Sequence, residues 1–214
     1  MAQKCILFDL DGTLTDSGEG IINCATVALE HFHLPVPDRE TMRVFVGPPL
    51  KDTFQKFGVP ADRVDEAISI YRQRYIPIGK FENQPYPGVY DLLERLNQDG
   101  HRLFVATSKP EQMSVDILDH FDLTRYFERV CGATLDGSRD EKSAVIAYLL
   151  ECVNDTANTM MVGDTVFDTL GAAAHGIPMI GVSWGFGEVE AMQNAGAKAI
   201  AHTMDELYNL LTQE

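Results

Sequence analysis

Basic side chains are scarce in this 214-residue sequence. It holds 17 lysine and arginine residues against 32 aspartate and glutamate residues, which gives a formal net charge of −15. Nucleic acids and anionic membranes are disfavoured as partners, because both carry dense negative charge. An anionic small molecule would need a cation and a few local basic groups to reverse the field inside its site. We therefore expect no nucleic acid and no membrane among the partners, and a monomer or a weak homodimer.

Several other signals are missing. No Cys-x-x-Cys pair occurs among the four cysteines, which are Cys5, Cys24, Cys131 and Cys152. Free buried thiols fit a reducing compartment. No apolar run approaches the roughly 18 residues of a transmembrane helix, and no secretory signal pattern is visible. Since 45% of the residues are hydrophobic, the chain can build a substantial core, and we expect a soluble, cytoplasmic protein.

Short apolar runs recur along most of the chain, and amphipathic segments separate the later ones. The runs predict strands over residues 5–8, 103–106, 160–162, 179–182 and 199–201. The amphipathic segments predict helices over residues 87–99, 110–121, 142–153, 166–175 and 204–211. Strands that alternate with helices in this way are typical of a parallel sheet built from βα units. The predicted fold class is α/β, with a doubly wound, Rossmann-like sheet.

Residues 16–86 interrupt this alternation, because they show no strand pattern. Apolar residues recur there at helical spacing, at Ile21, Ile22, Ala25, Ala28, Leu29 and Phe32, and residues 62–75 form a second amphipathic run. A helical block inserted straight after the first strand would act as a cap over the strand ends. We therefore predict a core domain of residues 1–15 and 87–214 and a helical cap domain of residues 16–86.

An acidic pair, Asp9 and Asp11, directly follows the first predicted strand. Side chains alternate along a strand, so both carboxylates should face one cavity while Leu10 turns to the other side. Two carboxylates repel by roughly 4 kcal/mol at 4 Å with an effective dielectric constant near 20. A divalent cation with oxygen ligands is the obvious group to offset that repulsion.

Two other interpretations of the acidic pair were weighed. An EF-hand calcium loop that began at Asp9 would need glutamate at its twelfth position, where this chain has Gly20. That interpretation is therefore disfavoured. A solvent-facing turn stays open, because aspartate and glycine are ordinary turn residues.

Polar residues follow two further predicted features. Thr107 and Ser108 end the strand over residues 103–106, and Pro110 suits an early helical position. Hydroxyl and free N–H groups at a helix start can bind an anion, although a simple N-cap explains them equally well. Lys142 opens a predicted helix, where most lysines are merely solvated.

A second acidic pair, Asp164 and Asp168, follows the apolar run at residues 160–162. The two residues are four apart, so they can share a helix face if the helix begins early enough. Both could instead be acids that cap a helix N-terminus. Four carboxylates at two strand ends, with hydroxyls and a lysine at others, are hard to explain by capping alone.

Together these motifs resemble those of the haloacid dehalogenase superfamily, in its phosphatase branch. Residues 9–14 resemble the first family motif, Thr107-Ser108 the second, Lys142 the third and residues 163–168 the fourth. The helical insert resembles the family's first type of α-helical cap. Residues 86–88, 106–110 and 132–142 are similar to those of phosphoglycolate-phosphatase-like members, and most similar to the 5′-nucleotidase-like group.

This resemblance implies roles for particular residues. Asp9 would be the nucleophile, Asp11 the general acid and base, and Lys142 a third catalytic residue. Mg²⁺ would be held at Asp9, Asp11 (through its backbone carbonyl) and Asp164, with Asp168 in support. Substrate-binding residues would be Thr13, Thr107, Ser108 and Lys109 in the core, with Arg43 and Lys51 in the cap.

The implied activity is hydrolysis of a small phosphate monoester through an aspartyl-phosphate. A nucleoside 5′-monophosphate is the preferred substrate, and phosphoglycolate comes next. Two alternatives stay open, which are a β-phosphoglucomutase-like phosphoryl transfer and a catalytically silent interaction module of the same fold.

Overall fold

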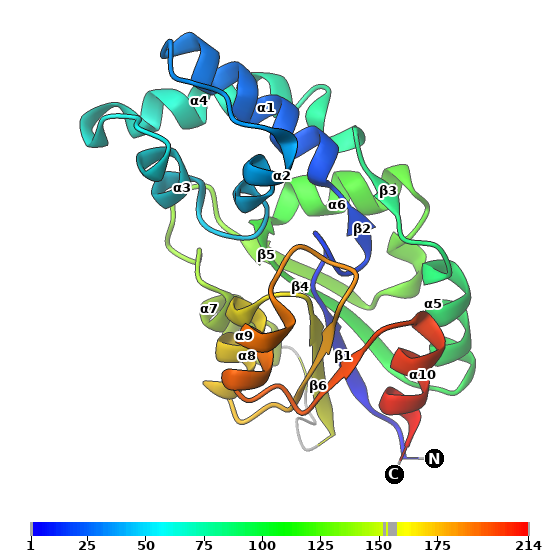
Figure 1. Cartoon of the computed structure of the whole chain (residues 1–214). Helices are drawn as coiled ribbons and strands as arrows, with labels where there is room; N and C mark the ends of the chain where they lie inside the picture. The colour runs from blue at the N-terminus through cyan, green and yellow to red at the C-terminus, as the bar shows by residue number, and fades with distance from the viewer. Residues whose placement is uncertain (1, 152, 154–157, 214) are drawn as a thin grey trace. The chain divides into compact units, whose positions relative to one another are not determined.

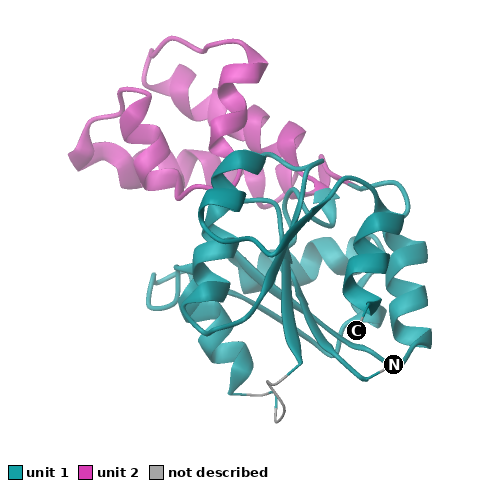
Figure 2. Ribbon diagram, turned by 60° about the horizontal axis from the view of Figure 1, so that its bottom comes forward, with its two compact units in different colours: residues 1–15, 85–214 teal, residues 16–84 magenta. Residues whose placement is uncertain are grey.

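The structure is a computed structural model that describes residues 2–151, 153 and 158–213 (Figure 1). It separates into two compact units (Figure 2). Unit 1 contains residues 1–15 and 85–214, and unit 2 contains residues 16–84. Two short strands, β2 (Thr15–Asp16) and β3 (Gln84–Pro85), pair with each other where the chain passes between the units.

Unit 1 is built on a six-stranded sheet whose strand order is β5-β4-β1-β6-β7-β8. Every pair of neighbouring strands in this sheet is parallel. The strands are β1 (Cys5–Phe8), β4 (Arg102–Pro110), β5 (Arg129–Ala133), β6 (Thr159–Gly163), β7 (Met179–Val182) and β8 (Ala199–Ala201). The predicted α/β fold class is confirmed.

Helices cover both faces of this sheet. One face packs against α5 (Val89–Gln98), α6 (Glu111–His120) and α10 (Met204–Thr212), and the other against α7 (Lys142–Leu150), α8 (Val166–Ala173) and α9 (Val189–Asn194). Strand β1 supplies both faces by simple alternation. Ile6 and Phe8 belong to the first cluster, while Cys5 and Leu7 belong to the second. Leu10 continues the first face and is fully buried, so it turns away from the side of Leu7 as predicted.

Most of the predicted elements of unit 1 are confirmed, and two were missed. The strands at residues 5–8, 179–182 and 199–201 have the predicted bounds. Strand β5 was missed because its apolar run is short and begins at the exposed Arg129. Helix α9 was missed because it has only six residues. Strand β4 was predicted too short, since it continues through Pro110.

Unit 2 consists of helices, as the sequence predicts for this segment. It contains α1 (Gly18–His31), α2 (Arg39–Met42), α3 (Leu50–Lys56) and α4 (Val64–Tyr75), with single 3₁₀ turns at Arg43–Phe45, Ala61–Arg63 and Gly79–Phe81. The apolar face predicted along α1 is buried at Ile21, Ile22, Ala25, Ala28 and Leu29. Unit 2 ends at Gln84, where the sequence placed the boundary after Tyr86. That this unit caps the strand ends stays a prediction.

Three of the four cysteines, Cys5, Cys24 and Cys131, are buried, and Cys152 lies outside the described residues. Within the ranges that the structure describes, each helix is too short or too polar to cross a membrane.

A matched pair of leucine variants tests the position of β1 in the core. Leu7 is fully buried in the sheet, whereas Leu170 on α8 is 55% exposed. We expect Leu7→Ala to lower the free energy of unfolding by about 2–5 kcal/mol, because it leaves a cavity in a packed core. Leu170→Ala should change that free energy by less than about 0.5 kcal/mol. Urea denaturation of both variants measures the difference, and equal effects would contradict the described packing.

Candidate active site

The sequence-predicted polar residues converge at the carboxyl ends of three adjacent central strands, β4, β1 and β6. After β1 the chain builds β4 and β5 on one side and then returns to place β6 on the other side of β1. Ligands of open α/β sheets bind at such a reversal of strand order. Asp9 stands directly at this point, since its backbone N–H donates to Val162 O of β6 at 2.9 Å.

Three buried carboxylates meet there, and we call Asp9, Asp164 and Asp168 the carboxylate cluster. One oxygen from each lies within 4.8 Å of the others. Asp9 follows β1, Asp164 follows β6, and Asp168 lies in the first turn of α8. Side-chain oxygens of Asp11 are not part of this cluster. Asp11 Oδ2 instead forms an ion pair of 2.6 Å with Lys109 Nζ.

The Lys142 ammonium group lies inside the cluster. Its Nζ is 2.8 Å from Asp9 Oδ1, 2.8 Å from Asp168 Oδ1 and 2.9 Å from the backbone oxygen of Ala106. An ammonium group has three donors, and these three partners account for all of them. Burial opposes the charged form of Lys142, but Asp168 and Asp9 together raise the pKa of its ammonium group above the usual range. Lys142 is therefore not solvated, as most lysines at a helix start are.

Burial also perturbs the carboxylates. It raises the pKa of Asp9 to about 6, against the attraction of Lys142 and with added repulsion from Asp168 and Asp11. Burial likewise raises the pKa of Asp164 well above its usual range, and the charges of Asp168 and Asp9 add to the effect. The cluster thus holds more negative charge than its own lysine compensates.

Asp164 is held in place by two donors. Thr13 Oγ1 donates to Asp164 Oδ1 at 3.2 Å, and the backbone N–H of Phe186 donates to Asp164 Oδ2 at 2.8 Å. Gly12 passes the same carboxylate with a φ of +84°, and a Cβ at this position would collide with it. The contact from Phe186 was missed in the sequence. The pair Gly185 and Gly187, just after the strand at residues 179–182, is the signal that could have revealed it.

The two side-chain oxygens of Asp168 have different partners. Its Oδ2 accepts from the backbone N–H of Thr165 at 3.0 Å and from Thr165 Oγ1 at 2.7 Å, which caps α8. Its Oδ1 faces Lys142. The helix-capping interpretation therefore holds for Asp168. A shared helix face with Asp164 is wrong, because α8 begins at Val166, after Asp164.

The helix start predicted near Ser108 is wrong, and the role of Thr107 and Ser108 in anion binding stays a prediction. The chain stays extended through Pro110, and α6 begins only at Glu111. Thr107 Oγ1 accepts the backbone N–H of Lys109 at 3.2 Å. Thr107 is buried and Ser108 half-buried at the end of β4, next to the Lys109–Asp11 ion pair in the chain.

The two residues predicted to contact substrate from unit 2 are on its surface. Arg43 lies 3.9 Å from Glu40, and its side chain is 45% exposed. Lys51 is exposed in the first turn of α3. Their roles in substrate binding stay predictions.

The chemistry of the cluster suits Mg²⁺. Hard divalent cations prefer carboxylate oxygens, and the cluster offers three carboxylates without a histidine or cysteine. The donor set therefore fits a magnesium ion at this end of the sheet.

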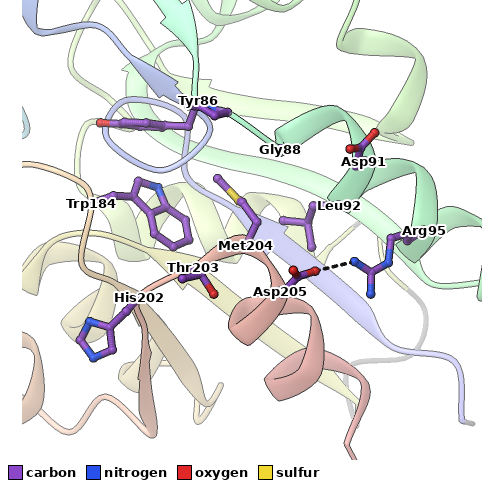
Figure 3. A pocket seen from close by; sticks show the side chains of 11 residues that line it. Tyr86, Gly88, Asp91, Leu92, Arg95, Trp184, His202, Thr203, Met204 and Asp205 are labelled. Atoms are coloured by element: carbon purple, nitrogen blue, oxygen red, sulfur yellow. Dashed lines mark hydrogen bonds and ion pairs between the residues drawn. The ribbon is translucent and has the colours of Figure 1, made fainter.

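Unit 1 also contains a separate cavity of about 400 Å³ beside α5 and α10 (Figure 3). Tyr86, Trp184 and Met204 contribute large side chains to its wall, and none of the cluster carboxylates lines it. Its wall nevertheless touches the first motif, because Trp184 Nε1 donates to the backbone oxygen of Thr13 at 3.2 Å. The cavity is distinct from the candidate active site, but Thr13 contacts both, through Trp184 on one side and Asp164 on the other.

Comparison with known proteins agrees with this geometry. Residues 6–182 match the family model of the haloacid dehalogenase-like hydrolases. The chain therefore belongs to the haloacid dehalogenase-like hydrolase family, and the resemblance of its motifs is confirmed. Within that family it is an enzyme of the phosphatase class.

Three similar proteins illustrate the range of the family. A 5′-nucleotidase from Pseudomonas aeruginosa is 41% identical over 190 residues, which cover 88% of this chain and 86% of the relative. Tyrosine-protein kinase PtkA from Mycobacterium tuberculosis is 40% identical over 211 residues, which cover 97% of this chain and 72% of the kinase. A crystal structure of a predicted phosphatase from Clostridium acetobutylicum superposes with a TM-score of 0.93 at 41% identity, and covers 99% of both chains.

Replacing Lys142 tests the charge balance of the cluster. We expect Lys142→Met to lower the free energy of unfolding of the metal-free protein by about 3–5 kcal/mol at pH 8, because it leaves buried carboxylates without their cation. The loss should be smaller at pH 5. As the pH falls, carboxylates with a raised pKa take up protons in the folded protein before they do so in the unfolded chain. Their burial therefore destabilises the folded protein less at pH 5. Urea denaturation in EDTA at both pH values measures this, with the exposed Lys198→Met as the matched control. A loss that does not depend on pH would contradict the assignment.

Proposed function

We propose that this protein is a magnesium-dependent phosphomonoesterase that hydrolyses a small phosphate monoester through an aspartyl-phosphate on Asp9. The observation that carries the proposal is the arrangement around Asp9. Its carboxylate is buried at the sheet centre, lies 2.8 Å from Lys142 and shares a cluster with two further carboxylates. A separate carboxylate, Asp11, follows two residues later and is excluded from that cluster.

In the first step, an oxygen of Asp9 attacks phosphorus, and the bond from phosphorus to the leaving oxygen breaks. Asp11 donates a proton to that oxygen, so an alcohol leaves instead of an alkoxide. Lys142 keeps Asp9 ionised and fixes its Oδ1, which leaves Oδ2 as the attacking atom. A carboxylate nucleophile divides a difficult hydrolysis into two easier displacements.

In the second step, water attacks the phosphorus of the aspartyl-phosphate. Asp11 now takes a proton from that water, and the bond from phosphorus to Asp9 breaks, which releases inorganic phosphate. Thr107 and the Ser108 N–H, both at the end of β4, would hold the phosphoryl oxygens. Hydrogen-bond donors aimed at these oxygens stabilise the charge that spreads over them in the transition state.

Asp9 and Asp164 would hold Mg²⁺, together with the backbone carbonyl of Asp11. When bound, the ion neutralises phosphoryl charge and favours the approach of one anion to another. Asp168 supports this site indirectly, because its oxygens are engaged with Thr165 and Lys142.

A nucleoside 5′-monophosphate is the substrate that we favour, and phosphoglycolate is second. The similarity to a 5′-nucleotidase supports this order. Phosphoryl transfer to an acceptor other than water is the competing activity, and the similarity to a protein named as a tyrosine kinase gives it a specific basis. One experiment separates these activities. Phosphate release is measured with magnesium across nucleotides, phosphoglycolate, sugar phosphates, pyrophosphate and phosphotyrosine, and labelled ATP is offered with a tyrosine peptide. Transfer to the peptide without phosphate release would overturn the proposal.

Asp9→Asn should reduce turnover by at least about 1,000-fold, because it removes the nucleophile. Phosphate release from the preferred substrate measures this effect. Folding should persist, since an amide of the same shape replaces the carboxylate. Asp91→Asn is the matched control, because Asp91 is exposed on α5 and should keep full activity. Retained turnover in Asp9→Asn would remove Asp9 from the mechanism.

EDTA should abolish phosphate release, and added Mg²⁺ should restore it. Below pH 6 the affinity for Mg²⁺ should fall by at least about tenfold per pH unit, because Asp9, with a pKa of about 6 in the metal-free protein, must lose its proton before it can bind the ion, and Asp164 also has a raised pKa. Calorimetric titration with Mg²⁺ between pH 5 and pH 7.5 measures this dependence. Full activity in metal-free buffer would contradict the role of the ion.

A further inference from the structure

Lys109 and Asp11 form a close and largely buried ion pair. The distance from Lys109 Nζ to Asp11 Oδ2 is 2.6 Å, and the two side chains are 7% and 14% exposed. They are 98 residues apart in the sequence. Lys109 lies near the end of β4, and Asp11 lies in the turn that follows β1. The pair therefore ties together two adjacent strand ends.

The backbone that carries Lys109 is fixed by its neighbours. Its N–H donates to Thr107 Oγ1 at 3.2 Å. Gly132 of β5 passes so close that a Cβ there would collide with the backbone oxygen of Lys109 and with the backbone of Glu111. The carboxylate of Glu111 then accepts from the N–H of Gly132 at 3.1 Å and from Arg139 at 2.9 Å. These contacts fix the backbone from which the Lys109 side chain reaches Asp11.

The ion pair also gives the two side-chain oxygens of Asp11 different surroundings. Oδ2 is engaged with the ammonium group, while the buried Oδ1 has no hydrogen-bond partner among the residues that the structure describes. Two oxygens on one carboxyl group can rotate into each other's place unless one of them is held. An ammonium on Oδ2 prevents that rotation, and so presents Oδ1 in a constant direction.

We propose that Lys109 is a positioning residue for Asp11, and not a ligand of the substrate phosphoryl group. This inference rests on the proposed function, in which Asp11 exchanges a proton with the leaving oxygen and then with water. Lys109 fixes Oδ2, and Oδ1 carries the proton to the leaving oxygen as its bond to phosphorus breaks. In the second step Oδ1 takes the proton of the water that attacks the aspartyl-phosphate.

Substrates with different leaving groups separate the two roles of Lys109. An alkyl phosphate needs a proton on its leaving oxygen, whereas p-nitrophenyl phosphate expels a stable anion without one. The value of kcat/KM reports only the steps up to loss of the leaving group. We therefore expect Lys109→Met to lower kcat/KM by about ten- to a hundred-fold for an alkyl phosphate, and by less than about threefold for p-nitrophenyl phosphate. Since water attack also needs Asp11, kcat should fall for both substrates.

Inorganic phosphate supplies a second, independent measurement. If Lys109 only positions Asp11, the inhibition constant of phosphate should be the same in the wild-type protein and in Lys109→Met. If Lys109 binds the phosphoryl group, that constant should rise, and kcat/KM should fall equally for both substrates. The second pattern would overturn the inference.

Three further variants complete the test. Asp11→Asn should show the same leaving-group dependence as Lys109→Met, and the double variant should be no worse than Asp11→Asn alone. Lys109→Arg keeps the charge and should recover part of the loss. If Asp11→Asn itself shows no leaving-group dependence, the proposed role of Asp11 fails. If Asp11→Asn shows it and Lys109→Met does not, only the positioning role fails. Lys198→Met again serves as the exposed control.

Discussion

Charge compensation around four carboxylates is the constraint on which the rest of this site depends. Asp9, Asp11, Asp164 and Asp168 gather at one end of the sheet, and two ammonium groups, Lys109 and Lys142, lie among them. Fully ionised, this set keeps two uncompensated negative charges. Burial raises the pKa values of Asp9 and Asp164, and the charges of the neighbouring carboxylates add to the effect. A divalent cation would carry the charge that balances this excess.

The fold makes this concentration of charge tolerable by holding each carboxylate rigidly. Carboxylate oxygens here meet a backbone N–H from Phe186, a hydroxyl from Thr13 and the capping contacts of Thr165. Donors fixed by the backbone lose little entropy when they bind a charged group. Parallel strands place their carboxyl ends at one edge, so residues far apart in sequence reach the same site without a long loop. The packing of the strands in the core therefore positions the side chains of the site.

The sequence predicted the acidic residues of the site more readily than the lysines that compensate their charge. Asp9 and Asp164 were predictable, because each follows a short apolar run that can only be a buried strand. The partners of Lys109 and Lys142 were not, since lysine is exposed by default and only tertiary packing directs it inward. The end of β4 was misjudged because its last residues are polar or proline, which a strand interior usually excludes. The contact from Phe186 is made by the backbone, which a side-chain pattern cannot reveal.

The chain is similar both to a protein named as a nucleotidase and to one named as a tyrosine kinase. Formation of an aspartyl-phosphate would need only the residues of unit 1, where Asp9, Asp11 and both lysines lie. The acceptor in the second step differs, because water hydrolyses the intermediate and a hydroxyl of another molecule would capture it. Residues that admit or exclude such an acceptor need not touch the carboxylate cluster at all. One core can therefore support several activities.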